Sequence, residues 1–272
     1  MKLADGVHFI EGKNRGKFPY CNSLIVGDAV IDPNCGIEVL NRIADKTDTA
    51  ILSHNHPDHS ALAWYLNRLK KKVLAPHNST RVEELARRFA RGMEERWAKF
   101  ATEYVGLRDF EADLYSISTG LGIDGHEIEL IKTSGHTDDM HLFLIDGKIL
   151  YSADIDLTGF GPWYGNPESD PFKFRKSIES LFGYDFDVIV PSHSMPVSGR
   201  DSIEGKLNEF LEHFDRRDEM IRELYGKGLS IDEMVELSPI YRKKISGLKD
   251  IMDYFERNMI EKHIEKMKGP QN

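Results

Sequence analysis

The sequence predicts an α+β fold in which two β-sheets pack face to face and helices cover the outside. Short apolar runs typical of strands occur in two groups, and each group is followed by a stretch with helical periodicity. This alternation favours a layered sandwich. From about residue 203 onward the pattern becomes helical alone. We therefore expect a catalytic domain at residues 1–202 and a small helical subdomain at residues 203–272.

Composition narrows the class of protein and its partners. The 272 residues can bury a substantial core, and 40% hydrophobic and 30% charged residues are typical of soluble proteins. No apolar run reaches the roughly 20 residues that span a bilayer, and the first residues lack the apolar centre of a secretory signal. We expect a cytoplasmic protein without membrane association. The net charge of −9 argues against nucleic acid as the main partner.

The first half of the chain combines strand and helix patterns. Two apolar runs within residues 23–32 flank Gly27-Asp28, which is a hairpin signal. Further strands are predicted at 7–11, 49–52 and 72–75. Apolar residues at spacings of three and four predict helices at 36–46, 60–70 and 79–104. We interpret the last as one amphipathic helix, and its role as a lid or as a contact in a homodimer stays open.

The second half begins with strands and ends with helices. Leu142–Ile145 and Lys148–Tyr151 are joined by Asp146-Gly147, the strongest short hairpin signal in the chain. Apolar runs predict two more strands, at 129–132 and 187–190. Helical spacing predicts the helices of the C-terminal subdomain at 203–214, 230–236 and 248–267.

The segment Ser53–Ser60 carries a dense set of metal-ligand side chains: His54, His56, Asp58 and His59. Imidazole and carboxylate are the ligands of catalytic zinc sites. The segment follows a predicted strand, and Pro57 disfavours a helical His56, so we expect a loop at the strand end. In an extended loop, side chains at alternate positions point the same way.

Three later strands end in the same way. The strand at 129–132 leads to His136, the one at 148–151 leads to Asp154, and the one at 187–190 leads to His193. Each residue alone is more often structural than a ligand. A ligand-type residue at the ends of four strands, however, is what a metal pocket at one edge of a sheet requires.

This ordered set resembles the metallo-β-lactamase superfamily, whose pattern is His-x-His-x-Asp-His, a His after Gly, a lone Asp and a final His. The resemblance implies an αββα sandwich, with a tail like the helical C-terminal unit of glyoxalase II and β-lactamase-like hydrolases. It implies that His54, His56 and His136 bind one metal, and that Asp58, His59 and His193 bind a second. Asp154 would bridge the two.

The same resemblance implies two Zn²⁺ ions and a hydrolase in which a metal-bridging hydroxide is the nucleophile. Catalytic roles then fall to Asp58, which would orient the hydroxide, and to His193. We expect a small-molecule ester, thioester or lactone as substrate, in the manner of glyoxalase II. Its glutathione thioester is not inferred, because Ser60-Ala61 and Asp138-Asp139 depart from that family's pattern.

The loop at 157–170 follows Asp154 directly and must begin at the metal edge. It concentrates three aromatic residues, Phe160, Trp163 and Tyr164, among Gly and Pro. They would form an apolar lip over the substrate pocket, or they would only pack the loop onto the domain.

Two other functions stay open. Persulfide dioxygenases resemble glyoxalase II but use one iron, bound by two His and one Asp. Single-domain β-lactamase-like nucleases carry a comparable tail, although the acidic charge of this chain argues against a nucleic-acid substrate.

Overall fold

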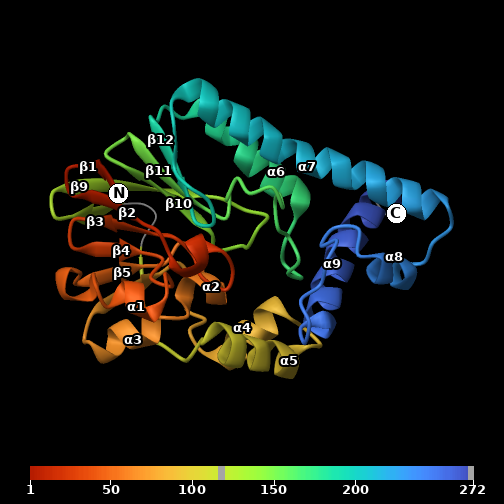
Figure 1. Ribbon diagram of the computed structural model, residues 1–272, viewed down its shortest axis with the longest axis horizontal. Helices are drawn as coiled ribbons and strands as arrows, with labels where there is room; N and C mark the ends of the chain where they lie inside the picture. The colour runs from red at the N-terminus through yellow and green to blue at the C-terminus, as the bar shows by residue number, and fades with distance from the viewer. Residues whose placement is uncertain (116–119, 269–272) are drawn as a thin grey trace.

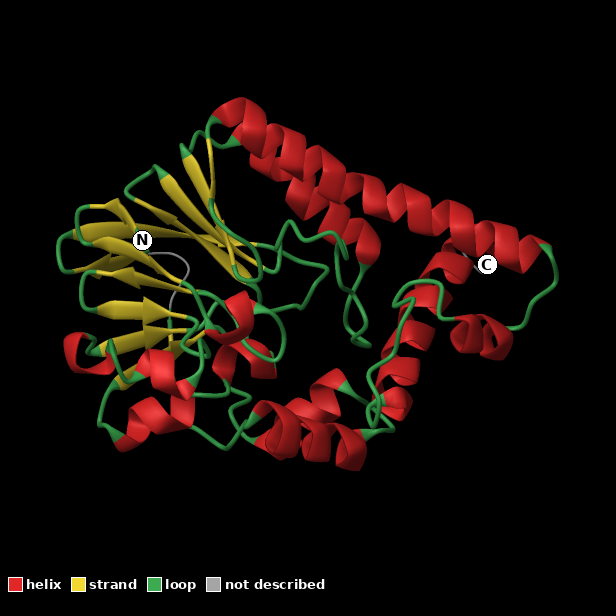
Figure 2. Ribbon diagram, viewed as in Figure 1, coloured by secondary structure: helices red, strands yellow, loops and turns green. Residues whose placement is uncertain are grey.

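The computed structural model describes residues 1–115 and 120–268. Two β-sheets pack against each other, and helices cover both outer faces (Figure 1, Figure 2). The predicted α+β sandwich is thereby confirmed. Most helices after residue 200 extend to one side of the sheets (Figure 1).

The first sheet contains seven strands within the described residues, in the order of the sequence. The pairings from β1 to β4 are antiparallel, and β4 to β7 run parallel. The strands are β1 (Lys2–Ala4), β2 (Val7–Ile10), β3 (Ser23–Val26), β4 (Ala29–Ile31), β5 (Thr49–Ile51), β6 (Lys72–Ala75) and β7 (Asp113–Leu114). Gly27, at φ +55°, closes the predicted β3–β4 hairpin.

The second sheet contains six strands within the same described residues, in the order β13-β12-β11-β10-β9-β8. Among their pairings, only that of β11 with β12 is parallel. The strands are β8 (Leu121–Ile123), β9 (His126–Lys132), β10 (His141–Ile145), β11 (Ile149–Ala153), β12 (Val188–Pro191) and β13 (Val197–Ser198). The predicted hairpin turn is confirmed, with Asp146 and Gly147 both at positive φ.

Alternation along the strands sorts the apolar side chains into two cores. Ile31 and Ile51 face the second sheet, whereas Val30 and Ala50 face the helices on the outside. Successive side chains of a strand point to opposite faces, so both faces of these central strands are buried. On the first sheet the covering helices are α1 (Ile37–Leu40) and α3 (Ala63–Arg68), and on the second they are α6 (Pro171–Ser180) and α7 (Arg200–Gly226).

The predicted single helix at 79–104 is wrong. The segment forms α4 (Val82–Phe89), α5 (Glu94–Lys99) and the π-helix η3 (Phe100–Val105). Ala90 leaves helical geometry and Gly92 adopts φ +83°. The predicted helix at 36–46 is also shorter, because α1 is followed by a turn and the 3₁₀ helix η2 (Ala44–Lys46).

The C-terminal helices return to the catalytic edge. After α7, α8 (Ile231–Leu237) packs on α9 (Lys249–Lys268), which begins beside α5 and runs back to α7 (Figure 1). An Arg96–Asp250 ion pair joins α5 to α9, and Tyr254 of α9 donates a hydrogen bond to the Arg91 carbonyl, just before α5. The division at residue 202 stays a prediction. Among the described residues, no helix is both long and apolar enough to cross a membrane.

Candidate metal centre

The His-rich segment lies at the carboxyl end of β5, half in a loop and half in a short helix. His54 and His56 precede Pro57, which begins α2 (Pro57–Ser60). His56 adopts φ −60° and ψ 147°, the extended geometry favoured before proline. Asp58 and His59 belong to α2, so the prediction that the whole segment is a loop holds only for its first half.

The three other predicted residues reach the same edge from the second sheet. His136 lies in the turn between β9 and β10, Asp154 directly follows β11, and His193 follows β12. Gly135 adopts φ +106°, and a Cβ there would lie 2.1 Å from the Phe174 nitrogen. The residue before His136 must therefore be glycine, because helix α6 packs closely against it.

The structure brings all seven side chains together in two groups. His54, His56, His136 and Asp154 form one, and Asp58, His59 and His193 form the other. Within each group the nearest ligand-type atoms lie within 4.8 Å of one another. Six of the seven residues are buried, and His193 is partly exposed.

Asp154 lies between the two groups. Its Oδ2 atom is 3.0 Å from Nε2 of His136, and its Oδ1 atom is 2.9 Å from Nε2 of His59 and 3.4 Å from Nε2 of His193. Two ligands of one tetrahedral zinc, each about 2.0–2.1 Å from the ion, lie about 3.3 Å apart. The spacing of these atoms therefore fits donors that share a metal ion.

The hydrogen-bond partners of three histidine rings indicate which ring nitrogen carries the proton. The Nδ1 atoms of His136 and His193 lie 2.8 and 2.7 Å from the carbonyl oxygens of Trp163 and Gly16, to which they donate. The Nδ1 atom of His59 donates to a carboxylate oxygen of Asp32 (2.7 Å). In its neutral form each ring then carries its proton on Nδ1, so each Nε2 can present a lone pair to a metal ion.

Asp32 is a buried anchor that the sequence analysis missed. Besides His59, its carboxylate accepts hydrogen bonds from the Ser53 backbone (2.7 Å), the Ser53 hydroxyl (2.6 Å) and the Tyr151 hydroxyl (2.9 Å). A signal was present, because Asp32 directly follows β4 at the same edge of the sheet. It was overlooked because Asp32 lies outside the His-rich segment and matches no ligand position.

The electrostatics of the cluster favour a bound cation. Burial, and after it the neighbouring His136, lowers the pKa of His56 to about 3. Burial alone would lower the pKa of His59 as well, but the carboxylates of Asp154 and Asp32 raise it to about 10. Without a metal, a proton on His59 balances the carboxylates. Within the described chain, the buried Nε2 of His59 has no aligned hydrogen-bond partner, which fits a metal ligand.

Comparisons with known proteins agree with this geometry. Residues 23–193 match the family described as the metallo-beta-lactamase superfamily. The chain belongs to this superfamily. The matched segment begins at β3 and ends at His193, so it contains all seven residues of the two groups.

Individual relatives of the superfamily are more distant. A linear primary-alkylsulfatase from Pseudomonas sp. (strain ATCC 19151) is 28% identical over 129 residues, which cover 46% of this chain. The chain matches only 24% of that curated relative's length.

Solved structures of the superfamily share the fold. A metallo-beta-lactamase family protein from Thermus thermophilus superposes with a TM-score of 0.74 at 19% identity, over 98% of this chain and 95% of its own. The sec-alkylsulfatase Pisa1 from Pseudomonas sp. superposes with a TM-score of 0.60 at 20% identity, over 97% of this chain and 49% of its own.

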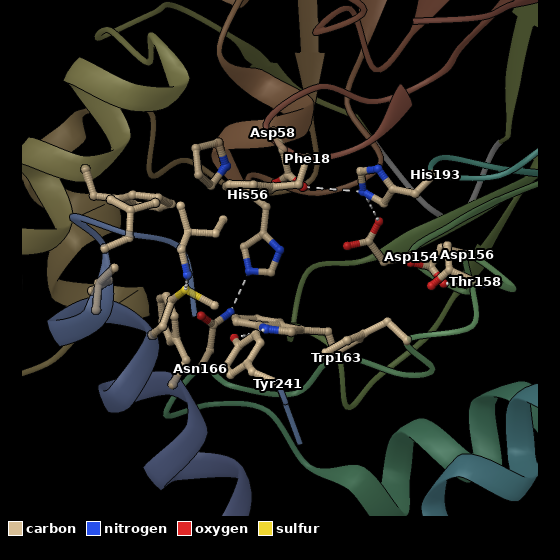
Figure 3. Close-up of a pocket in the computed structure, with 18 of the residues that line it drawn as sticks. Phe18, His56, Asp58, Asp154, Asp156, Thr158, Trp163, Asn166, His193 and Tyr241 are labelled. Carbon is tan, nitrogen blue, oxygen red and sulfur yellow. Dashed lines mark hydrogen bonds and ion pairs between the residues drawn. The ribbon is translucent and has the colours of Figure 1, made fainter. Parts of the chain in front are cut away.

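An apolar cavity of about 490 Å³ opens onto the candidate metal centre of this superfamily member (Figure 3). His56, Asp58, Asp154 and His193 form its polar end. The remaining wall is largely aromatic and aliphatic. It includes Phe18, Trp97, Phe100, Phe160, Trp163, Tyr241, Ile251, Met252 and Phe255.

Two of the three predicted lip residues line this cavity. Phe160 and Trp163 do so, and the Trp163 indole donates to the Tyr241 hydroxyl (2.7 Å). Tyr164 lies in the core instead: it is fully buried, stacks on Phe214 and contacts His263 (2.8 Å). Consecutive residues of an extended loop point to opposite sides, which separates Tyr164 from Trp163.

Helix α9 holds the loop that contacts His56, one of the candidate metal ligands. The amide group of Asn166 lies 2.5 Å from Nε2 of His56. Asn258 and Lys262 of α9 donate to the carbonyls of Gly165 (2.7 Å) and Asn166 (2.6 Å). Burial lowers the pKa of Lys262 to about 8. No pattern in the sequence indicated that the C-terminal helix supports the centre.

A buried ion-pair network lies behind the centre. Arg88 of α4 forms an ion pair with Asp139 (2.8 Å) and a bidentate ion pair with Glu168 (2.8 and 2.7 Å). Asp139 also accepts from the backbone N–H of Asn55 (3.3 Å), between His54 and His56. Arg88 therefore joins the three loops that carry the first ligand group.

Proposed function

We propose that this protein is a dinuclear zinc hydrolase that cleaves a small-molecule ester, thioester or lactone carrying an apolar group. The observation that carries the proposal is the placement of Asp154, whose two carboxylate oxygens face different histidine groups. The apolar cavity that meets this centre supports the substrate class.

His54, His56 and His136 would hold one ion, and Asp58, His59 and His193 would hold the other. Asp154 would contact both. Zinc at such a site lowers the pKa of a bound water to about 7 and polarises the bond under attack. Asp58 lines the cavity, and its Oδ2 atom lies 3.4 Å from Nε2 of His193. Its carboxylate is thus placed to orient a nucleophilic water, and the aromatic wall limits access of bulk solvent.

A sulfate ester is a second candidate for the scissile group. It is supported by the match to a linear primary-alkylsulfatase over 46% of this chain. Lys243 lines the cavity and makes no ion pair within the described residues, so a cation is available for an anionic head group. The apolar cavity suits an alkyl chain in either case.

The iron-dependent and nuclease alternatives have weaker support. A mononuclear iron site would leave the second group, Asp58, His59 and His193, without a role. A nuclease pocket would be expected to carry several cationic groups for phosphates, whereas Lys243 is the one lysine or arginine among the described residues that line this cavity.

Metal analysis followed by a substrate panel tests the proposal. Protein purified without added metal should contain about two zinc ions per chain by mass spectrometry. Zinc-loaded protein should then hydrolyse carboxylic esters, thioesters or lactones faster than phosphodiesters. Cleavage of sulfate esters alone would select the second candidate. One iron per chain and oxygen uptake with a persulfide would overturn both.

A further inference from the structure

A second cavity, of about 530 Å³, lies next to the one at the metal centre. The two share Phe100, Leu248 and Ile251 as lining residues. These three side chains therefore lie between the two cavities and line both of them. The proposed function makes no use of this outer cavity.

The shared wall comes from two segments that are distant in sequence. Phe100 begins the π-helix η3, Leu248 directly precedes α9, and Ile251 lies in the first turn of α9. Insertions of π-helix into α-helices often occur at functional sites. Phe100 and Leu248 are only partly buried, so their side chains can adjust without breaking the core.

Exposed apolar side chains surround the two cavities. Phe18 and Ile245 of the inner cavity are 38% and 43% exposed, and Tyr104 of the outer cavity is 42% exposed. The rings of Phe18, Phe100 and Tyr104 stack on one another with centroids 5.9–6.1 Å apart. An apolar strip thus runs from the inner to the outer cavity, and exposure of this kind marks binding surfaces.

The outer cavity is lined by both apolar and charged side chains. Its apolar residues are Phe100, Tyr104, Leu248 and Ile251, and its charged residues are Arg96, Lys99, Glu103 and Asp250, of which Arg96 and Asp250 pair with each other. The apolar residues offer contacts along a hydrocarbon chain.

We propose that the substrate carries a long unbranched hydrocarbon chain that passes Phe100, Leu248 and Ile251 and continues into the outer cavity. The inference rests on the proposed function, because the scissile head group must lie at the metal centre. The inner cavity holds the part of the chain next to that group. The outer cavity selects for chain length.

Chain binding can be measured apart from catalysis. Straight-chain carboxylates from butanoate to tetradecanoate are titrated into the metal-loaded protein by calorimetry. Each buried methylene should tighten binding by about fourfold. In the wild type this gain should persist through the longer chains. In Leu248→Trp the larger ring would fill the space between the two cavities, so affinity should stop rising at a shorter chain.

Two variants control for altered folding. Leu248→Met keeps the side-chain volume and should retain the wild-type length profile. Leu237→Trp places the same ring at a position that is 59% exposed, at the end of α8, and should leave the profile unchanged. Zinc content and the unfolding midpoint establish that each variant folds.

The outcomes separate this inference from the proposed function. A length profile shared by wild type and Leu248→Trp overturns the outer chain site, even if short esters are hydrolysed. A profile truncated only in Leu248→Trp supports the chain site, even if no ester in the panel is cleaved. In that case the proposed hydrolysis would be wrong, whereas the chain-binding site would be supported.

Discussion

Asp154 and His59 approach to 2.9 Å, between Oδ1 and Nε2, without the alignment of a hydrogen bond. The other oxygen of Asp154 lies 3.0 Å from His136, in the opposite ligand group. In the proposed dinuclear centre, a carboxylate placed in this way would fix the separation of the two metal ions.

Replacing Asp154 should therefore disrupt both metal positions. Asp154→Asn keeps the shape of the side chain but removes its charge, and we expect metal content to fall below one ion per chain. Hydrolysis should fall by at least about a hundredfold, the upper range for loss of a supporting group alone. Mass spectrometry and ester assays measure both, with Asp187→Asn at the surface as control. If Asp154→Asn retained its full metal content, the proposed bridging role of Asp154 would be wrong.

Asp32 should control metal affinity without touching the metal. In Asp32→Asn the amide no longer provides a charged acceptor for Nδ1 of His59, so the ring loses its fixed orientation. We expect zinc affinity to fall by about 10–100-fold, as for other partners of metal-bound histidines. Competition with a chelator measures this affinity. An unchanged dissociation constant would show that Asp32 only stabilises the fold.

Arg88 and its neighbour Arg87 offer a matched comparison on one helix. Arg88→Ala leaves Asp139 buried and unpaired, which should cost about 3–5 kcal/mol of unfolding free energy. Within the described residues, Arg87 pairs only with Glu83, at the surface, so Arg87→Ala should change stability by less than about 0.5 kcal/mol. Urea unfolding of the two variants gives both values. Equal losses would contradict the structural role of the Arg88 network.

Trp163 should affect substrate binding more than metal binding. Its backbone carbonyl holds His136 and survives substitution, whereas its ring lines the cavity. In Trp163→Ala we expect a raised KM for bulky apolar esters and an unchanged zinc content. A wild-type substrate profile would mean that the ring only packs the loop.

Asp218 should make the C-terminal contact sensitive to acid. Burial would raise its pKa, but hydrogen bonds from His263 and Lys266 lower it to about 2. A carboxyl group with a lowered folded pKa stabilises the protein above its unfolded value of 3.8, and the contribution is lost as pH falls towards about 2. Relative to Asp218→Asn, the wild-type advantage in thermal unfolding should shrink over that window. Asp215→Asn, on the same helix, should show no such change.

The clustering of the seven candidate ligands was predictable because most of them lie in one short segment and the rest follow apolar strands. Apolar runs and turn residues also predicted the central strands of both sheets and the β3–β4 and β10–β11 hairpins, but not the short strands β1, β7, β8 and β13. The supporting groups were harder to find. Asp32 and Asn166 act through contacts with residues far away in sequence, and neither belongs to a repeated pattern.

The periodic spacing of apolar residues gave a wrong prediction where the backbone departs from regular helical geometry. The apolar spacing at 79–104 continues through Gly92, although the backbone breaks there. In the loop at 157–170, composition identified aromatic residues but could not tell which side each ring faces. Trp163 turns towards the cavity and Tyr164 towards α7 and α9.

The hydrogen bonds from Asn258 and Lys262 to the loop at 165–166 have a consequence for biosynthesis. The sandwich and all seven candidate ligands emerge from the ribosome well before α9 does. Until α9 docks, the loop that steadies His56 lacks its anchors. Full assembly of the centre therefore waits for the last described helix, and metal capture during synthesis should be weaker than capture by the finished chain.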